Sequence, residues 1–185
     1  MNIKELKITS RINVEKFEEF ILNLSKSSQL EFNHFGTINK KTIRKIVQNE
    51  LKRKDKMRFF ALMNEQLVGY SFLITFSKPT KKYNCTLGII ISDQFQNFGI
   101  GKKMCNYMIK KAWKRKFTKI WLNVFFDNKK AFHLYKSLGF QIEGIFIDDE
   151  IYGNKKRHVI SMALLKNKNF KFNQRFQLIK KLNSI

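Results

Sequence analysis

The most informative chemistry in this 185-residue chain lies in residues 88–104, where a strand-like apolar run leads through two glycines into a helix-like segment. The first amides of a helix have no partners inside the helix, and together with the helix dipole they form a site for an anion. Gly99 and Gly101 carry no Cβ, so a phosphate can approach the backbone there. Lys102 and Lys103 add positive charge beside the turn. The sequence therefore predicts a phosphate-binding turn.

Two common phosphate-binding motifs do not fit this glycine pair. The dinucleotide motif G-x-G-x-x-G requires a third glycine where Met104 stands, and neither Gly99 nor Gly101 begins a G-x-x-x-x-G-K-[ST] P-loop. A glycine pair before a helix can also serve only a tight turn from strand to helix. The pair by itself therefore does not identify the ligand.

Two longer patterns are more specific. Residues 96–101, Gln-Asn-Phe-Gly-Ile-Gly, resemble the [RQ]-x-x-G-x-[GA] motif of the GNAT superfamily of N-acetyltransferases. Residues 128–140 resemble the N-x-x-A-x-x-x-Y-x-x-x-G-F block of the same family, and Leu-Asn-Val at 122–124 is similar to the strand between the two blocks. The resemblance extends over roughly residues 68–165. It implies transfer of an acetyl group from acetyl-CoA to an amine, with no metal.

The resemblance also implies which residues hold the cofactor. In this family the amides of the glycine turn bind the pyrophosphate of coenzyme A, and the pantetheine arm lies in a gap beside the preceding strand. Ile89 and Ile91 would then give backbone hydrogen bonds to the pantetheine. The complete set that the resemblance assigns to acetyl-CoA is Ile89, Ile91, Gln96, Phe98, Gly99, Ile100, Gly101, Lys102, Asn123, Asn128 and Ala131.

Two asparagines in that set have alternative roles. Asn128 stands where it could cap the helix that follows, and capping is compatible with a contact to the pantetheine. Asn123 alternates along its strand with Leu122 and Val124, so it points to the opposite face. It either lines the cleft or faces a polar layer.

Tyr135 is the leading catalytic candidate. It occupies the position of the family's general acid, where a phenol can protonate the departing thiolate of coenzyme A. The alternative is a packing tyrosine between Phe132 and Leu138 on a short helix.

The general base is not identified by the sequence. An alkyl ammonium titrates near about 10, so the acceptor must lose a proton before it attacks. Many family members place a glutamate on the strand before the glycine turn, but residues 84–91 contain no carboxylate. A water chain could replace it. His34 and Glu31, in a segment that often contacts the acceptor in this family, are the other candidates for base or acceptor binding.

Hydrophobic periodicity and turn residues predict the elements that position these groups. The fold class is α/β, a GNAT-like mixed and mostly antiparallel central sheet of six to seven strands flanked by about four helices. The predicted strands are 3–8, 57–62, 68–76, 84–91, 119–125, 140–148 and 157–165, and the predicted helices are 14–24, 40–51, 99–113 and 128–138. One domain covers 1–165. A basic extension, 166–185, forms either an amphipathic helix on the domain edge or a free tail.

The charge of the chain bears on its partners. Lys and Arg number 37 against 14 Asp and Glu, a net charge of +23. Compositional drift explains part of the lysine but not the scarcity of acids, and the positive field favours anionic partners. It argues against a polyamine acceptor and for one that is anionic overall, such as a sugar nucleotide. An amino sugar, another small amine and a protein N-terminus all remain open as acceptors.

The alternative function is a GNAT-like binding module of weak catalysis, whose basic surface at residues 110–116 and in the extension binds RNA or the ribosome. No RNA-reading motif accompanies these charges. Two sparse cysteines predict a reducing cytoplasm, and we expect no signal peptide and no membrane span. The sequence leaves a homodimer open.

Overall fold

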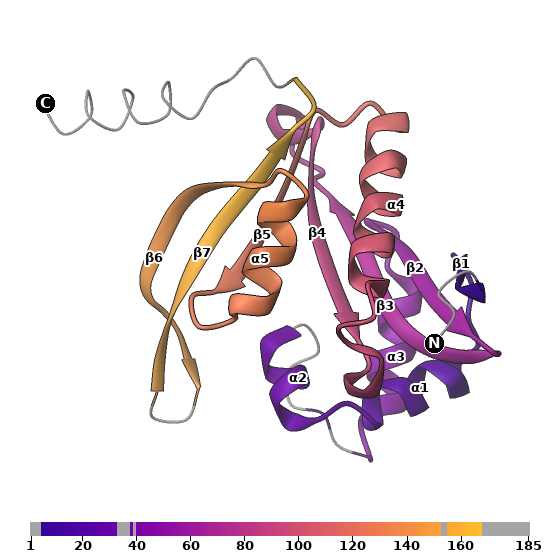
Figure 1. Ribbon diagram of the computed structural model, residues 1–185. Helices are drawn as coiled ribbons and strands as arrows, with labels where there is room; N and C mark the ends of the chain where they lie inside the picture. The colour runs from indigo at the N-terminus through magenta and orange to yellow at the C-terminus, as the bar shows by residue number, and fades with distance from the viewer. Residues whose placement is uncertain (1–4, 33–37, 39, 153–154, 168–185) are drawn as a thin grey trace, which may run out of the picture.

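A seven-stranded sheet with the order β1-β2-β3-β4-β5-β7-β6 forms the centre of the computed structural model (Figure 1). The structure describes residues 5–32, 38, 40–152 and 155–167. The strands are β1 (Lys7–Thr9), β2 (Lys56–Met63), β3 (Gln66–Thr75), β4 (Asn84–Ile91), β5 (Lys119–Phe125), β6 (Gln141–Tyr152) and β7 (Lys155–Leu165). The helices are α1 (Val14–Leu22), α2 (Lys26–Phe32), α3 (Ile43–Lys52), α4 (Ile100–Lys114) and α5 (Lys129–Ser137), with short 3-10 turns η2 (Pro79–Lys81) and η3 (Asp93–Phe95).

The separation of β4 from β5 is the feature that shapes the site. These two strands are parallel and pair only from Asn84–Lys119 to Thr86–Trp121. Beyond that point they diverge toward their carboxyl ends (Figure 1). All the other neighbouring strands pair antiparallel. The opening that shapes the site lies at the parallel β4–β5 boundary.

Helices cover both faces of the sheet. On one face α4 and α5 bury a core that includes Leu87, Leu122 and Met108, all at most 3% exposed. On the other face α1 and α3 pack over Phe60 and Tyr70, which are fully buried. The divergence of β4 and β5 thus lies between two layers of packed helices.

A buried ion pair attaches α3 to the second face. The Lys56 ammonium lies 2.6 Å from the Glu50 carboxylate, and the Tyr70 hydroxyl donates to the same carboxylate. Burial lowers the pKa of Lys56 to about 8, and the bond to Glu50 opposes that shift. The Lys56 ammonium also lies 4.1 Å from the centroid of the Phe72 ring. This network fixes the surface of β2 and β3 on which Phe32 of α2 packs.

The predicted fold class is confirmed, with corrections at particular elements. The seven-stranded, mostly antiparallel sheet agrees with the prediction, but the described residues contain five α-helices where about four were expected. The additional helix is α2, which the polar run at 25–29 concealed. β6 and β7 are longer than predicted. A register shift between Phe146 and Glu150 interrupts the apolar alternation, so the sequence pattern did not show the full length of the hairpin. The strand predicted at 3–8 is observed at Lys7–Thr9, and residues 5 and 6 of the predicted range do not belong to a strand.

Two turns depend on left-handed backbone conformations. Asn64 and Glu65 join β2 to β3 with φ of 47° and 61°, the left-handed pair that a two-residue hairpin needs. Gly139 ends α5 with φ of 91°. His34 and residues 168–185 lie outside the described residues, and so does the predicted conformation of the basic extension. None of the helices in the described ranges is long and apolar enough to cross a membrane.

Gly88 on β4 provides a stability test of this arrangement. It pairs with Phe72 on β3, and a Cβ added at Gly88 would lie 2.3 Å from the Phe72 ring. We predict that Gly88→Ala lowers the free energy of unfolding by about 1–3 kcal/mol, because the ring must shift in a packed core. Urea unfolding measures the change.

Gly144→Ala is the matched control, since an added Cβ there meets nothing within 4 Å. It should change the free energy of unfolding by less than about 0.5 kcal/mol. Equal losses in the two variants would contradict the packing described for Gly88.

Candidate active site

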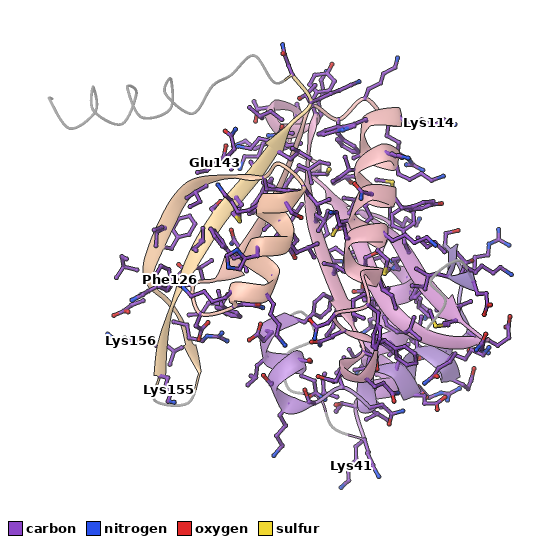
Figure 2. All side chains as sticks on the ribbon, viewed as in Figure 1. Lys41, Lys114, Phe126, Glu143, Lys155 and Lys156 are labelled. Carbon is purple, nitrogen blue, oxygen red and sulfur yellow. The ribbon has the colours of Figure 1, made fainter. Side chains whose placement is uncertain are left out.

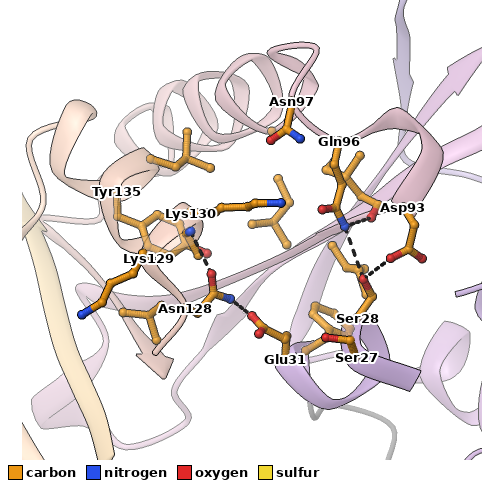
Figure 3. A pocket seen from close by; sticks show the side chains of 18 of the residues that line it. Ser27, Ser28, Glu31, Asp93, Gln96, Asn97, Asn128, Lys129, Lys130 and Tyr135 are labelled. Carbon is orange, nitrogen blue, oxygen red and sulfur yellow. Dashed lines mark hydrogen bonds between the residues drawn. The ribbon is translucent and has the colours of Figure 1, made fainter. Parts of the chain in front are cut away.

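A cavity of about 760 Å³ lies where β4 and β5 diverge. Its walls come from α2, the carboxyl end of β4, the turn before α4, the middle of β5 and the first turns of α5 (Figure 3). This size is ordinary for the site of a small molecule or cofactor. The cavity therefore joins segments that are distant in the sequence into one candidate site.

The glycine turn forms one end of the cavity. Asn97 and Gly99 adopt left-handed backbone conformations with φ of 64° and 79°, and α4 begins immediately afterwards at Ile100. Gly99 and Gly101 both line the cavity. A Cβ at Gly101 would lie 3.4 Å from the Leu134 side chain, at the edge of ordinary contact. The start of α4, with its unpaired amides and positive dipole end, thus adjoins the cavity without side-chain cover.

Gln96 ties this turn to α2. Its side-chain amide donates to the Ile91 carbonyl and to the Ser28 hydroxyl, each at 3.3 Å (Figure 3). The Asp93 carboxylate accepts from the Ser25 amide and hydroxyl at 2.9 and 2.8 Å, and from the Ser28 hydroxyl at 2.6 Å. Partial burial works to raise the pKa of Asp93, but these hydrogen bonds together hold it below its usual value. α2 is thereby fixed as the wall opposite α5.

Asn128 has two partners within the protein. Its side-chain oxygen accepts from the Ala131 amide at 2.9 Å and caps α5. Its side-chain nitrogen donates to the Glu31 carboxylate of α2, so the cap also reaches across the cavity (Figure 3). The predicted capping role is confirmed.

Two carboxylates beside the cavity have opposite electrostatic environments. Burial raises the pKa of Glu31, the charge of Arg157 opposes this shift, and the charge of Asp127 adds to it. Asp127 accepts a 2.5 Å hydrogen bond from Arg157, and this bond holds its pKa below the usual value. Arg157 is itself placed by Phe125, whose ring centroid lies 3.6 Å from the guanidinium carbon. Because the pKa of Glu31 is raised and that of Asp127 is lowered, Glu31 is the better proton acceptor of the two carboxylates.

Tyr135 reaches the cavity from α5. Its side chain is 6% exposed, lines the cavity and packs on Phe140, with ring centroids 5.7 Å apart. Burial raises the pKa of Tyr135, with a smaller contribution from Cys105, so the phenol stays protonated at neutral pH. Tyr135 therefore both packs in the core and lines the cavity, so the two roles considered for it are compatible.

The cavity gathers most of the sequence-predicted residues. Those on its walls are Glu31, Ile89, Ile91, Gln96, Gly99, Gly101, Lys102, Asn123, Asn128, Ala131 and Tyr135. Phe98 and Ile100 are not among the lining residues: Phe98 is 45% exposed on the turn, and Ile100 is 1% exposed in the core beside Met104. The geometry of the turn directs the Phe98 and Ile100 side chains away from the cavity, so that only their backbone can contribute to it. His34 is outside the described residues.

Sequence reasoning missed several wall residues. These are Ser27, Ser28, Phe32, Ile90, Asp93, Phe95, Asn97, Val124, Asp127, Lys129, Lys130 and Leu134. Asp127, Lys129 and Lys130 flank the motif asparagine, so their sequence position was a usable signal. Ser28 on α2 had no such signal, because its partner Asp93 lies 65 residues away. Within the described ranges, no group of three His, Cys, Asp or Glu side chains is placed to hold a metal ion.

Comparisons with known proteins agree with this geometry. Residues 22–140 match the model of the Acetyltransferase (GNAT) family. Over 86 residues the chain is 30% identical to the L-amino acid N-acetyltransferase AaaT of Escherichia coli K12, an alignment that covers 45% of this chain and 52% of that protein. The chain thus spans about half the length of this curated relative.

Two solved structures illustrate the likeness of fold. A GNAT-family acetyltransferase from Streptococcus pneumoniae superimposes with a TM-score of 0.70 at 21% identity, covering 88% of this chain and 100% of that one. The spermidine N-acetyltransferase from Vibrio cholerae, in complex with CoA and spermine, gives a TM-score of 0.74 at 19% identity, with 88% and 96% covered. At these identities the likeness concerns the fold alone.

Proposed function

Because the chain belongs to the Acetyltransferase (GNAT) family, we propose that it transfers the acetyl group of acetyl-CoA to an amine by direct attack in a ternary complex. The single observation that carries this proposal is the cavity at the β4–β5 divergence, which has an anion-binding helix start at one end and Tyr135 in its wall. Neither feature is needed for a protein that only binds through its surface.

The residues of the cavity fit acetyl-CoA. Pairing of β4 with β5 stops at Thr86, so within the described sheet the β5-facing backbone of residues 87–91 has no strand partner. Backbone polar groups away from water require partners, and the amides of a pantetheine arm can supply them. Lys102 on the first turn of α4 and Lys130 on α5 line the cavity, and their charge would favour the phosphates at the start of α4. Phe98 and Ile100 contribute through backbone only.

Each chemical step has a residue suited to it. Glu31, with its raised pKa, accepts a proton from the incoming ammonium, directly or through water. The freed amine attacks the acetyl carbonyl carbon, a C–N bond forms and the C–S bond breaks. Tyr135 donates its phenolic proton to the departing sulfur. The attacking nitrogen loses its second proton as the amide forms, and this proton returns to the Tyr135 phenolate through solvent, which leaves the amide and the free thiol as products. Held side by side in one cavity, the two reactants gain from proximity as well.

The acceptor is proposed to be a small primary amine. Glu31 and Asp127 both line the cavity, although the whole chain contains only 14 acidic residues. Arg157 pairs most closely with Asp127, which leaves Glu31 as the carboxylate better placed to receive a protonated amine, whereas the field of the whole chain favours an acceptor that is anionic overall. An amino sugar attached to a nucleotide satisfies both conditions, because it carries an ammonium and phosphates. We expect the enzyme to work in the cytoplasm, since Cys85 and Cys105 are free thiols.

Tyr135→Phe tests the general acid. The Tyr135 hydroxyl makes no hydrogen bond to another described residue, so its removal should leave the fold intact. We predict a fall in kcat of about 100-fold or more with little change in KM for acetyl-CoA. Release of free thiol, screened against a panel of amines and then followed with the best one, measures both constants. An unchanged kcat would assign Tyr135 to packing alone.

Glu31→Gln tests the base. In the wild type we expect kcat/KM to fall as the pH drops through the pKa of Glu31, which lies above its ordinary 4.5, because the protonated carboxyl cannot accept a proton. The glutamine variant should lose about 100-fold at neutral pH and lose this acid limb.

Asp127→Asn is the control, since the pKa of Asp127 is shifted downward. It should retain the acid limb. Persistence of the limb in Glu31→Gln would move the base to water or to another residue.

A further inference from the structure

A concentration of positive charge lies at the end of the domain remote from the cavity. It consists of Lys78, Lys81 and Lys82 around η2, Lys114, Arg115 and Lys116 at the end of α4, and Lys166 after β7, which together are called the basic end. All seven side chains are exposed. Figure 2 shows Lys114 extending from the last turn of α4 into solvent.

Backbone hydrogen bonds bring these three segments together. The Tyr83 carbonyl, one residue after Lys82, accepts from the Thr118 amide at 2.8 Å. The Thr118 carbonyl in turn accepts from the Lys166 amide at 2.9 Å. The lysines of the η2 loop, the α4 end and the β7 end are therefore held on one surface by ordered backbone, although they are distant in the sequence.

The charge at the basic end is not compensated locally. Between Glu65 and Asp127 the sequence contains a single acidic residue, Asp93, which hydrogen bonds to serines beside the cavity. The nearest ion pairs use neighbouring residues, Lys119 with Glu143 at 2.7 Å and Arg53 with Asp55 at 2.6 Å. None of the seven side chains forms an ion pair with another described residue. Clustered like charges repel, so an anionic partner would stabilise this surface.

This surface is separate from the cofactor site. α4 has 15 residues, and at about 1.5 Å per residue its two ends lie about 22 Å apart. The glycine turn adjoins the first end and the basic end the other (Figure 1). The phosphates of acetyl-CoA therefore do not account for the lysines at the basic end.

Aromatic rings accompany the charges. The Tyr83 side chain is 53% exposed, and the Lys82 ammonium lies 4.9 Å from its ring centroid. Phe76 and Trp121 stack with centroids 6.1 Å apart and planes inclined by 11°, with the Lys81 ammonium 5.6 Å from the Phe76 ring. Basic surfaces with accessible aromatic rings are typical of proteins that bind single-stranded nucleic acid, because bases stack on the rings while cations hold the phosphates.

An anionic membrane is the less suitable partner. Stable attachment to a bilayer surface requires an apolar face next to the charges. Among the described residues, Tyr83 is the one large, exposed apolar side chain in the segments of the basic end, since the others lie on α1, the glycine turn, the loop after β5, and β6.

We propose that the basic end binds single-stranded RNA, with its lysines on the phosphates and Tyr83 stacked on a base. The remaining residues, 168–185, begin directly after this surface and add five basic residues and no acidic one. This inference does not depend on the catalytic proposal, because the two sites share no residue.

Fluorescence anisotropy with a labelled oligouridine of about 12 nucleotides, from about 50 to about 200 mM salt, tests the contribution of the charges. A Lys78→Gln, Lys82→Gln, Lys114→Gln variant should weaken binding and lower the slope of log K against log salt by about 2. The matched control is Lys7→Gln, Arg11→Gln, Lys45→Gln, which removes the same charge from exposed positions elsewhere. It should leave the slope nearly unchanged. Equal effects of the two variants would overturn the proposal, because binding would then follow net charge alone.

Two further measurements examine the mode of binding. Tyr83→Leu should weaken oligouridine binding about tenfold without changing the salt slope, and should leave heparin binding unchanged. Saturating acetyl-CoA should leave the RNA affinity of the wild type unaltered. Displacement of RNA by acetyl-CoA would place the RNA at the cofactor site, and tighter binding to phosphatidylserine vesicles than to RNA would identify a membrane surface. Either result, or an unchanged affinity in Tyr83→Leu, would refute the proposal. Normal acetyl-CoA binding by every variant checks that it is folded.

Discussion

The early end of the β4–β5 pairing is the constraint on which the rest of the structure depends. Ladder hydrogen bonds connect the two strands only as far as Thr86 and Trp121, and beyond them β4 and β5 have no pairing with each other within the described sheet. Helical layers pack on both faces of the sheet around this gap. In the proposed complex, a ligand with its own amide groups would complete the sheet at that point.

Several charged and polar contacts hold α2 in place as the opposite wall of the cavity. Asp93 holds the start of α2 through Ser25 and Ser28, and Asn128 holds its last turn through Glu31. The same asparagine caps α5, so one side chain fixes the separation of the two helices across the cavity. The distribution of charge follows this framework: lysines line the cofactor mouth, carboxylates line the α2 side, and uncompensated cations collect at the remote end of α4.

Local patterns predicted the fold and many of the residues that line the cavity. The apolar run in residues 84–91, the glycine pair before α4 and the Asn128 cap are encoded within short stretches, and the structure contains each of them. α2 escaped prediction because its stability comes from Asp93 and from Phe32 packing on Tyr70, contacts that no local window contains. Phe98 and Ile100 were assigned to the cofactor by motif position, but the left-handed turn at Asn97 and Gly99 directs their side chains elsewhere. The lowered pKa of Asp127 likewise requires Arg157 from the last strand, and the raised pKa of Glu31 requires burial beside the cavity, which only the packed fold provides.

Calorimetric titration with acetyl-CoA of the wild type, Gly101→Ala and Gly101→Glu tests the central claim most directly. A Cβ at Gly101 would lie 3.4 Å from Leu134, so alanine fits with little adjustment, whereas a glutamate carboxylate would compete with phosphate at the start of α4. The account predicts binding in the micromolar range by the wild type, similar binding by Gly101→Ala, and a loss of at least about 100-fold in Gly101→Glu, at both low and moderate salt. Absence of binding by the wild type, or equal affinity of the glutamate variant, would contradict the assignment of this cavity to acetyl-CoA.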